Sequence, residues 1–385
     1  MYEFEKYFAT SEEIKKHNEE VAMVWKAYSE DKPIRVPAGG GIDPYRLIAL
    51  DDRYSYKDYH LNPETMMEVQ AQCAELNSRI IMGDNIVASP EEWPLNLDYW
   101  PFSDEAYWGC EIEFADRLQP KVYHLFEDEK VDPETIPIPD PFHDNFMSVI
   151  TNTFHRMREL AASRTFHGKS YSDQIAAGGM TTTYGIFSTA LQLRGINLFL
   201  DMYEDPEYVK KLLSKVAEGY AARSKAWSKY VPGKPWQAIV YDHGIDMISM
   251  KHYVEFLVPV YKRIKQMLGS SQYDASIDHC GHGEEVIRYK HKHFGVNSFT
   301  NLNASFINIE RLRRDLGDEV YMHIEIHPEI VLNGPVDRIY QTVRETLTPA
   351  VKGKGRLSFG HAGNWTAPME HLQAFYNAVK EYGHY

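Results

Sequence analysis

Three short segments near the end of the chain place metal-binding types of side chain where an apolar, strand-like run ends. They are Asp278-His279-Cys280-Gly281-His282, His323-Ile324-Glu325-Ile326-His327 and Gly360-His361-Ala362-Gly363. Thiolate and imidazole suit zinc, and a catalytic zinc needs about three protein ligands with one position left open. Because the strand ends of an α/β barrel converge on one face, the three segments predict one shared metal site.

The alternation of side chains along a strand narrows the choice of ligands. Asp278 and Cys280 share one side of their strand, whereas His279 faces the other side unless the chain is already turning into its loop. We predict Cys280 and His361 as two ligands, and the third comes from Asp278, His279, Glu325 or His327. The plainer alternative is that Cys280 is only a small buried side chain and that the histidines bond to backbone groups.

The segment Tyr241-Asp242-His243-Gly244 also ends a strand-like run. An Asp-His pair at such a place can position a substrate or protonate it, so we predict Asp242 and His243 as catalytic residues. In the alternative interpretation, Asp242 caps the following turn and Gly244 supplies an unusual φ angle.

Two glycine-rich segments offer backbone amides to a ligand. Residues 178–185 (GGMTTTYG) lie at a loop-to-helix junction that suits an anion or a polar rim, and we predict that Tyr184 contacts the substrate. The segment lacks the Lys-Ser/Thr ending of a phosphate loop, which argues against nucleotide binding. Gly39-Gly40-Gly41 is interpreted as a flexible turn, and Arg46, which follows it, is predicted to bind substrate.

These segments depend on a repeating alternation of strand-like and helix-like runs from about residue 145 onward. Helices are predicted at 146–162, 188–200, 206–220, 253–267, 283–291, 307–316, 336–347 and 367–381. Strands are predicted at 237–241, 275–277, 296–300, 320–326 and 356–359. At least five such β/α units predict an α/β fold with a parallel sheet, and the length favours an eight-stranded (β/α)8 TIM barrel.

The first 140 residues predict an extension rather than further β/α units. Residues 1–30 and the stretch after Asn62-Pro63 have the apolar spacing of helices. Residues 87–141 are rich in proline and aromatic residues, which predicts irregular chain packed as a cap or arm. We therefore predict an N-terminal extension at 1–140 that packs on a barrel at 141–385.

Composition limits the partners and the location. The chain has 385 residues, and 41 Lys+Arg against 55 Asp+Glu give a net charge of −14, the wrong sign for binding nucleic acid or an anionic membrane surface. The sequence shows neither a long apolar run typical of a membrane span nor the pattern of a secretory signal at its start. Three widely spaced cysteines favour a reducing compartment, so we expect a cytoplasmic protein.

An ordered set of motifs over about residues 145–385 resembles the uroporphyrinogen decarboxylase superfamily. The set includes Gly185-Ile186-Phe187-Ser188-Thr189-Ala190, Asp201-Met202-Tyr203-Glu204-Asp205-Pro206-Glu207, Tyr261-Lys262-Arg263-Ile264, His279-Cys280-Gly281, Pro328-Glu329-Ile330-Val331-Leu332 and Pro368-Met369-Glu370-His371-Leu372. The resemblance implies a (β/α)8 barrel whose active site lies at the C-terminal ends of the strands.

Within this superfamily, the start of the chain is similar to the corrinoid-dependent methyltransferases. True tetrapyrrole decarboxylases carry an arginine-rich segment that holds substrate carboxylates. Residues 35–66 instead resemble components that demethylate methoxylated or methylated compounds. The zinc members of that branch use a His-x-Cys-Gly segment and a later cysteine, and here Asp278 and His361 stand at the two matching positions. Such ligands imply a more Lewis-acidic zinc, which favours polarising an ether oxygen over activating a thiol.

The sequence and the resemblance together predict a zinc-assisted methyltransferase that moves a methyl group from a small-molecule donor to the corrinoid (cobalamin) of a partner protein. A homodimer is one candidate for its oligomeric state. One alternative is a metal-free decarboxylase, in which Asp242 interacts with a protonating ring and Arg46 or Arg53 anchors a carboxylate. Another is a catalytically idle barrel that serves as a subunit of a complex.

Overall fold

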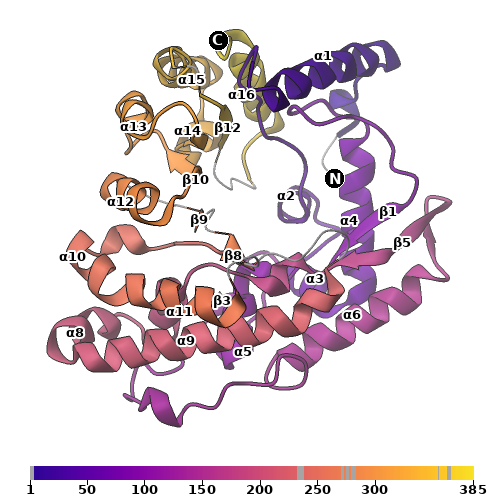
Figure 1. The fold of residues 1–385 in the computed structure, drawn as a ribbon. Helices are drawn as coiled ribbons and strands as arrows, with labels where there is room; N and C mark the ends of the chain where they lie inside the picture. Colours follow the sequence, from indigo (N-terminus) through magenta and orange to yellow (C-terminus); the bar gives the residue numbers. More distant parts are fainter. Residues whose placement is uncertain are drawn as a thin grey trace. The chain divides into compact units, whose positions relative to one another are not determined.

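The computed structural model describes residues 4–231, 238–269, 273–274, 277–278, 283–353, 355–361 and 366–385 (Figure 1). The chain divides into two compact units, each made of separate segments. The first unit comprises Met1–Tyr54, Val69–Glu91 and His279–Tyr385, and the second comprises Ser55–Glu68 and Glu92–Asp278. The helix α4 (Pro63–Asn77) contributes residues to both units.

The first unit contains three neighbouring parallel strands and several helices. Its strands are β10 (Ser298–Asn303), β11 (Tyr321–Ile326) and β12 (Leu357–His361), in the order β12-β11-β10. Its helical segments are η1 (Phe4–Tyr7), α1 (Ser11–Ser29), α2 (Pro44–Leu50), α12 (Glu284–Phe294), α13 (Ile309–Leu316), α14 (Pro328–Asn333), α15 (Val336–Ala350) and α16 (Met369–Tyr382).

Strand β11 presents its two faces to different surroundings. Met322, Ile324 and Ile326 are buried in the core, whereas Tyr321, His323 and Glu325 on the opposite face are half-buried. This is the alternation expected of a strand, in which successive side chains point to opposite sides. The polar face of β11 is therefore the one available to a site.

The second unit contains a parallel sheet of very short strands, in the order β6 (Thr182–Thr183), β7 (Ala238–Val240) and β8 (Tyr273–Asp274). In a further sheet of the same unit, β1 (Trp93–Asn96) pairs in parallel with β5 (Lys169–Ala176), and β4 (Thr165–Phe166) pairs with β5 in the antiparallel sense. The remaining strands are β2 (Ile112–Glu113), β3 (Lys121–Val122) and β9 (Ile277–Asp278).

The second unit also contains many helical segments. They are α3 (Tyr56–Leu61), η2 (Trp100–Phe102), α5 (Ser103–Trp108), η3 (Pro133–Thr135), α6 (Met147–Ala161), η4 (Gly178–Thr181), α7 (Ile186–Arg194), α8 (Asn197–Glu204), α9 (Pro206–Trp227), η5 (Ser228–Tyr230), η6 (Ile245–Met247), α10 (Met250–His252), the π-helix η7 (Tyr253–Leu257) and α11 (Val258–Leu268). Helix α9 begins as its sequence predicts: Asp205 caps it by accepting a hydrogen bond from the Tyr208 amide at 3.2 Å, and Pro206 occupies the first turn.

The structure confirms the predicted α/β fold with parallel strands. The parallel strands of the described ranges belong to several short sheets, so the closed eight-stranded barrel stays a prediction, as does the division at residue 140. In the described part of the chain, no helix combines the length and the apolar character that crossing a bilayer requires.

Two predictions about secondary structure are wrong. The stretch 87–141 is not irregular throughout, because it contains β1 and α5. Pro94 is tolerated inside β1, since this strand is at the edge of its sheet. The single helix predicted at 188–200 is two helices, α7 and α8, because Gly195 ends α7 in a positive-φ conformation (φ 67°).

Candidate functional site

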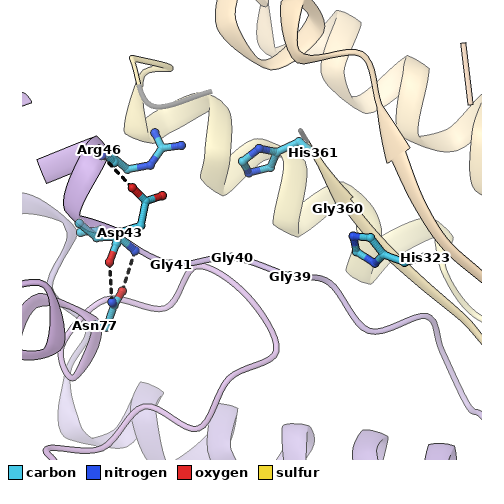
Figure 2. Close-up of a pocket in the computed structure, with 10 residues that line it drawn as sticks. Gly39, Gly40, Gly41, Asp43, Arg46, Asn77, His323, Gly360 and His361 are labelled. Carbon is cyan, nitrogen blue, oxygen red and sulfur yellow. Dashed lines mark hydrogen bonds between the residues drawn. The ribbon is translucent and has the colours of Figure 1, made fainter. Parts of the chain in front are cut away.

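A pocket of about 400 Å³ lies in the first unit, beside the C-terminal end of β12 (Figure 2). It is lined by Gly39, Gly40, Gly41, Ile42, Asp43, Arg46, Asn77, His323, Gly360 and His361. Two residues predicted from the sequence, Arg46 and His361, therefore line the same pocket. His361 is the last residue of β12, the strand end where a site was expected.

The glycine turn at 39–41 forms one wall of this pocket and is held firmly in place. A Cβ atom on Gly40 would lie 1.6 Å from the carbonyl oxygen of Met82, so only glycine fits there. The carboxylate of Asp84 accepts a hydrogen bond from the Ala38 amide at 2.6 Å, and Asn85 Nδ2 donates to the Gly40 carbonyl at 2.7 Å. Gly40 therefore serves a close approach of two backbone segments, a role that the sequence did not reveal, and the flexibility of the turn stays a prediction.

Helix α2 brings Arg46 to the pocket. Asp43 caps this helix by accepting a hydrogen bond from the Arg46 amide at 2.9 Å, and Asn77 bonds to both the amide and the carbonyl of Ile42 at 2.8 Å. The Arg46 side chain is buried, and its Nη1 donates to the Ala367 carbonyl at 3.2 Å. A guanidinium has five N–H donors, so this arginine has the chemistry to bind a carboxylate as well.

His323 reaches the same pocket from β11, and the sequence analysis did not rank it among the ligands. Its Nδ1 lies 2.6 Å from Ser358 Oγ, which is also 2.6 Å from the Tyr321 hydroxyl, and its Nε2 lies 3.6 Å from Glu325 Oε1. A Cβ atom on Gly360 would lie 2.8 Å from His323 Nε2, so the glycine leaves room for the imidazole. The parallel register places His323 opposite Ser358, and this explains the contact between their side chains.

The predicted metal ligands are only partly within the described ranges. His361, Glu325 and His327 are described, and His327 Nδ1 accepts a hydrogen bond from the Glu329 amide at 3.3 Å. His279 and Cys280 lie outside the described residues, and for Asp278 the structure describes the backbone alone, at the end of β9. Among the side chains that the structure describes, no three of His, Cys, Asp and Glu gather closely enough to hold an ion. The zinc site with Cys280 therefore stays a prediction.

The carboxyl ends of β6 and β7 carry the other predicted residues, Tyr184, Asp242 and His243. The two strands are parallel, with Thr183 opposite Val240, and the His243 amide donates to the Tyr184 carbonyl at 3.1 Å. Their rings meet edge to face, with centroids 5.0 Å apart. These three residues belong to the second unit, and none of them lines the pocket beside β12.

Gly185 permits this close approach of the two strand ends. It has a φ of 138°, and a Cβ atom there would lie 2.6 Å from the Tyr241 carbonyl oxygen. The sequence shows the glycine but not the strand end that it meets.

Asp242 lies fully buried at the end of β7. Its carboxylate accepts hydrogen bonds from the hydroxyls of Tyr261 and Tyr253, the latter at 3.4 Å. Tyr253 is the first residue of the π-helix η7, a distortion that is frequent at functional sites. Asp242 is thus held by two tyrosines rather than exposed to solvent, whereas the neighbouring His243 is only half-buried.

Sequence reasoning missed the buried ion pair that supports Tyr184. Asp104 accepts hydrogen bonds from the Tyr184 amide at 3.0 Å and from Thr183 Oγ1 at 2.8 Å, and it pairs with Arg223 at 2.7 Å. Residues 178–185 were predicted to suit an anion, and the anion that the structure shows there is the carboxylate of Asp104. No local signal marks this pair, because Asp104 and Arg223 are 119 positions apart in the sequence.

Comparison with known proteins agrees with this architecture. Residues 105–382 match the uroporphyrinogen decarboxylase (URO-D) family, and no curated protein matches the sequence. The fold is similar to that of a methyltransferase from Methanosarcina mazei, with a TM-score of 0.60 and 18% sequence identity over 94% of this chain and 98% of that chain. The resemblance noted in the sequence is thereby confirmed: this chain belongs to the uroporphyrinogen decarboxylase family.

Proposed function

We propose that this protein is a methyltransferase that moves a methyl group from a methylated, and preferably methoxylated, small molecule to a corrinoid protein, assisted by zinc. The observation that carries the proposal is the position of His361 at the end of β12, on the wall of the pocket that Arg46 and His323 also line. The similarity in fold to a methyltransferase over nearly the whole chain supports it.

Zinc fits the chemistry of the proposed ligands. The thiolate of Cys280 and the imidazole of His361 are ligand types that zinc takes, and the third ligand would come from Asp278, His279, Glu325 or His327. When bound, the metal would supply Lewis acidity towards the heteroatom of the methyl donor.

The chain's own residues would bind the donor and supply the proton that the departing oxygen takes. Arg46 offers N–H groups to an acidic substituent, and Tyr184 contacts the donor. Asp242 and His243 are the proposed acid–base pair, in which the half-buried His243 gives a proton to the departing oxygen. The corrinoid of the partner protein would be the second substrate and would supply, as Co(I), the electron pair that accepts the methyl group, while the electrons of the broken carbon–oxygen bond stay on the oxygen.

Methyl transfer is tested by mixing the protein with a reduced corrinoid protein and methoxylated donors and recording the absorption spectrum of the methyl-cobalt product. We expect this spectrum to appear with the wild type and to be lost in His243→Ala. If no methoxylated donor gives the spectrum with zinc-loaded protein, the proposal is wrong.

The zinc content of the purified protein tests the ligands separately. We expect about one zinc per chain, lost in a Cys280→Ala/His361→Ala double variant. The control is His143→Ala, because the His143 side chain is 80% exposed and lies outside the proposed site. If the zinc-supplemented wild type holds no metal, or if the double variant retains it, the ligand assignment is wrong.

A metal-free decarboxylase is the second candidate, and the position of Arg46 favours it. A buried arginine on a pocket wall suits a substrate carboxylate. Arg53, the other arginine considered, pairs instead with Asp51 at 2.7 Å and does not line this pocket. Release of carbon dioxide from an acidic substrate by zinc-free protein would favour this candidate, and inactivity in both assays would favour an idle subunit.

A further inference from the structure

We propose that His323 donates a hydrogen bond from its Nε2–H group to an oxygen atom of the molecule bound in the pocket beside β12, and that Ser358 is the residue that positions it. This inference rests on the proposed function, because it takes this pocket as the place where the methyl donor binds. Neither residue is among the site residues predicted from the sequence.

A chain of two hydroxyl groups reaches the imidazole of His323. The Tyr321 hydroxyl lies 2.6 Å from Ser358 Oγ, and Ser358 Oγ lies 2.6 Å from His323 Nδ1. Both distances are those of hydrogen bonds that involve a hydroxyl. The chain can run in two directions, and its direction decides which ring nitrogen of the neutral imidazole carries the proton.

The Tyr321 hydroxyl favours the direction that begins with it. Burial raises the pKa of Tyr321, so the phenol keeps its proton and can donate it. Within the described ranges, Ser358 is the hydrogen-bond partner of this hydroxyl, and Ser358 then donates its own proton to Nδ1. The reverse direction would leave the phenol proton without an acceptor in these ranges.

The carboxylate of Glu325 favours the same tautomer. Its Oε1 lies 3.6 Å from His323 Nε2. A lone pair on Nε2 would face this negative charge, whereas an N–H group turns its positive end towards it. Both observations therefore place the proton of His323 on Nε2.

The Nε2–H group is on the pocket side of the ring. His323 lines the pocket, and 22% of its side chain is exposed (Figure 2). Gly360 lines the pocket too and keeps this side of the ring open, since a Cβ atom there would lie 2.8 Å from Nε2. The distance to Glu325 exceeds that of a normal hydrogen bond, so the N–H group can still bind a ligand oxygen.

A ligand with acceptor oxygens suits this pocket. Arg46, on another part of the wall, also carries N–H donors and no acceptor. A carboxylate is the strongest acceptor for such groups, because its charge strengthens the hydrogen bond. A small methylated carboxylate is therefore the most sensitive probe of the inference.

The first test determines the tautomer of His323 without a ligand. The histidines of the full chain are labelled with ¹⁵N, and their ring resonances are recorded by NMR in mildly alkaline solution, with His323→Gln identifying the signals. We expect Nε2 of His323 to carry the proton in the wild type. Ser358→Ala should lower the population of this tautomer, whereas Ser358→Thr, which keeps the hydroxyl, should retain it.

The second test measures the binding of methoxyacetate to the full chain without a corrinoid protein, by calorimetric titration. We expect His323→Ala to bind it about tenfold more weakly than the wild type, which corresponds to about 1.4 kcal/mol. His323→Gln keeps an N–H donor of similar reach and should stay within about threefold of the wild type. His323→Asn, whose amide is one carbon shorter, should bind as weakly as His323→Ala. His293→Ala, which removes an exposed imidazole of the same unit, is the matched control and should change nothing.

The inference is overturned if Nδ1 carries the proton, if the wild type does not bind methoxyacetate, or if His323→Ala binds it as tightly as the wild type. A thermal melt of each variant identifies loss of the fold, and the comparison of His323→Gln with His323→Asn then decides the question. Neither test involves methyl transfer. The expected binding together with absent methyl-cobalt would therefore reject the proposed function and leave the role of His323 standing.

Discussion

A single buried ion pair, Asp104 with Arg223, shows how one residue can hold a candidate binding residue in place. The side chains of Asp104 and Arg223 are 4% and 0% exposed, and the same carboxylate binds the Tyr184 amide. Removing one partner of such a pair leaves the other charge buried and unpaired. The cost is therefore much larger than for a pair at the surface.

We expect Asp104→Asn to lower the free energy of unfolding by about 3–5 kcal/mol, because the guanidinium of Arg223 would lose its charged partner. Urea denaturation measures this change. Glu207→Gln is the control, since Glu207 and Lys210 form an exposed pair whose loss should cost under about 1 kcal/mol. Equal losses in the two variants would contradict the prediction.

Glu105, the next residue, should make stability depend on pH. Burial, together with the charge of Asp104, raises the pKa of Glu105 to about 8 from its ordinary value of 4.5. Its Oε2 is buried and, within the described ranges, accepts no hydrogen bond. Because the folded chain holds this proton more tightly than the unfolded chain, the stabilisation is complete below about pH 4.5 and is lost as the pH rises through 8.

The variant Glu105→Gln cannot ionise and should therefore gain stability relative to the wild type as the pH rises. We expect the difference in free energy of unfolding to grow by up to about 1.4 kcal/mol per pH unit between pH 5 and pH 8. Urea denaturation at several pH values in this range measures it. Parallel curves for the two proteins would show that Glu105 ionises normally in the fold.

At the scale of elements, two adjacent glycines differ in the space available for a side chain. Gly39 has open space where a Cβ atom would be, whereas a Cβ atom on Gly40 would collide with the backbone at Met82. The start of the turn is also bonded to β12, because the Gly39 amide donates to the Phe359 carbonyl at 3.0 Å. Gly40 therefore sets the wall of the pocket.

We expect Gly40→Ala to destabilise the protein by at least about 2 kcal/mol, because a backbone segment must shift to admit the methyl group. Gly39→Ala should stay within about 1 kcal/mol of the wild type. Thermal or urea unfolding of the two variants compares them directly. Similar losses would mean that the turn yields more easily than its contacts indicate.

The elements also show where sequence patterns succeed and fail. Helix α9 was predicted from Asp205, Pro206 and its apolar spacing, because a cap and a helical face are local features. Strand β5 was not predicted, since only Tyr171 and Ile175 of its side chains are buried. The two-residue strand β6 carries too short a pattern to be distinguished from a loop.

At the scale of the whole molecule, burial limits which cysteines can react. Cys73 and Cys110 are buried thiols, with 5% and 6% of their surfaces exposed. Burial raises the pKa of Cys110 to about 12, so its reactive thiolate does not form at neutral pH. The sequence contains three cysteines, which leaves Cys280 as the candidate for reaction in the folded protein.

We expect a thiol reagent such as 5,5′-dithiobis(2-nitrobenzoate) to react quickly with at most one thiol per folded chain and with all three after unfolding. Absorbance of the released thiolate counts them. Cys280→Ser should show no fast reaction. Two or more fast thiols in the wild type would mean that Cys73 or Cys110 is more accessible than its burial indicates.

The sequence by itself determined the family, the α/β alternation and two residues of the pocket, Arg46 and His361. These follow from local spacing, from caps and from ordered motifs, which can be recognised without knowledge of the packing. The tertiary structure alone decided which residues meet. The approach of Gly40 to Met82, the stacking of Trp100 on Tyr184 and the pairing of Asp104 with Arg223 join residues from 42 to 119 positions apart. No local period encodes such contacts, because they depend on how separate elements pack against one another.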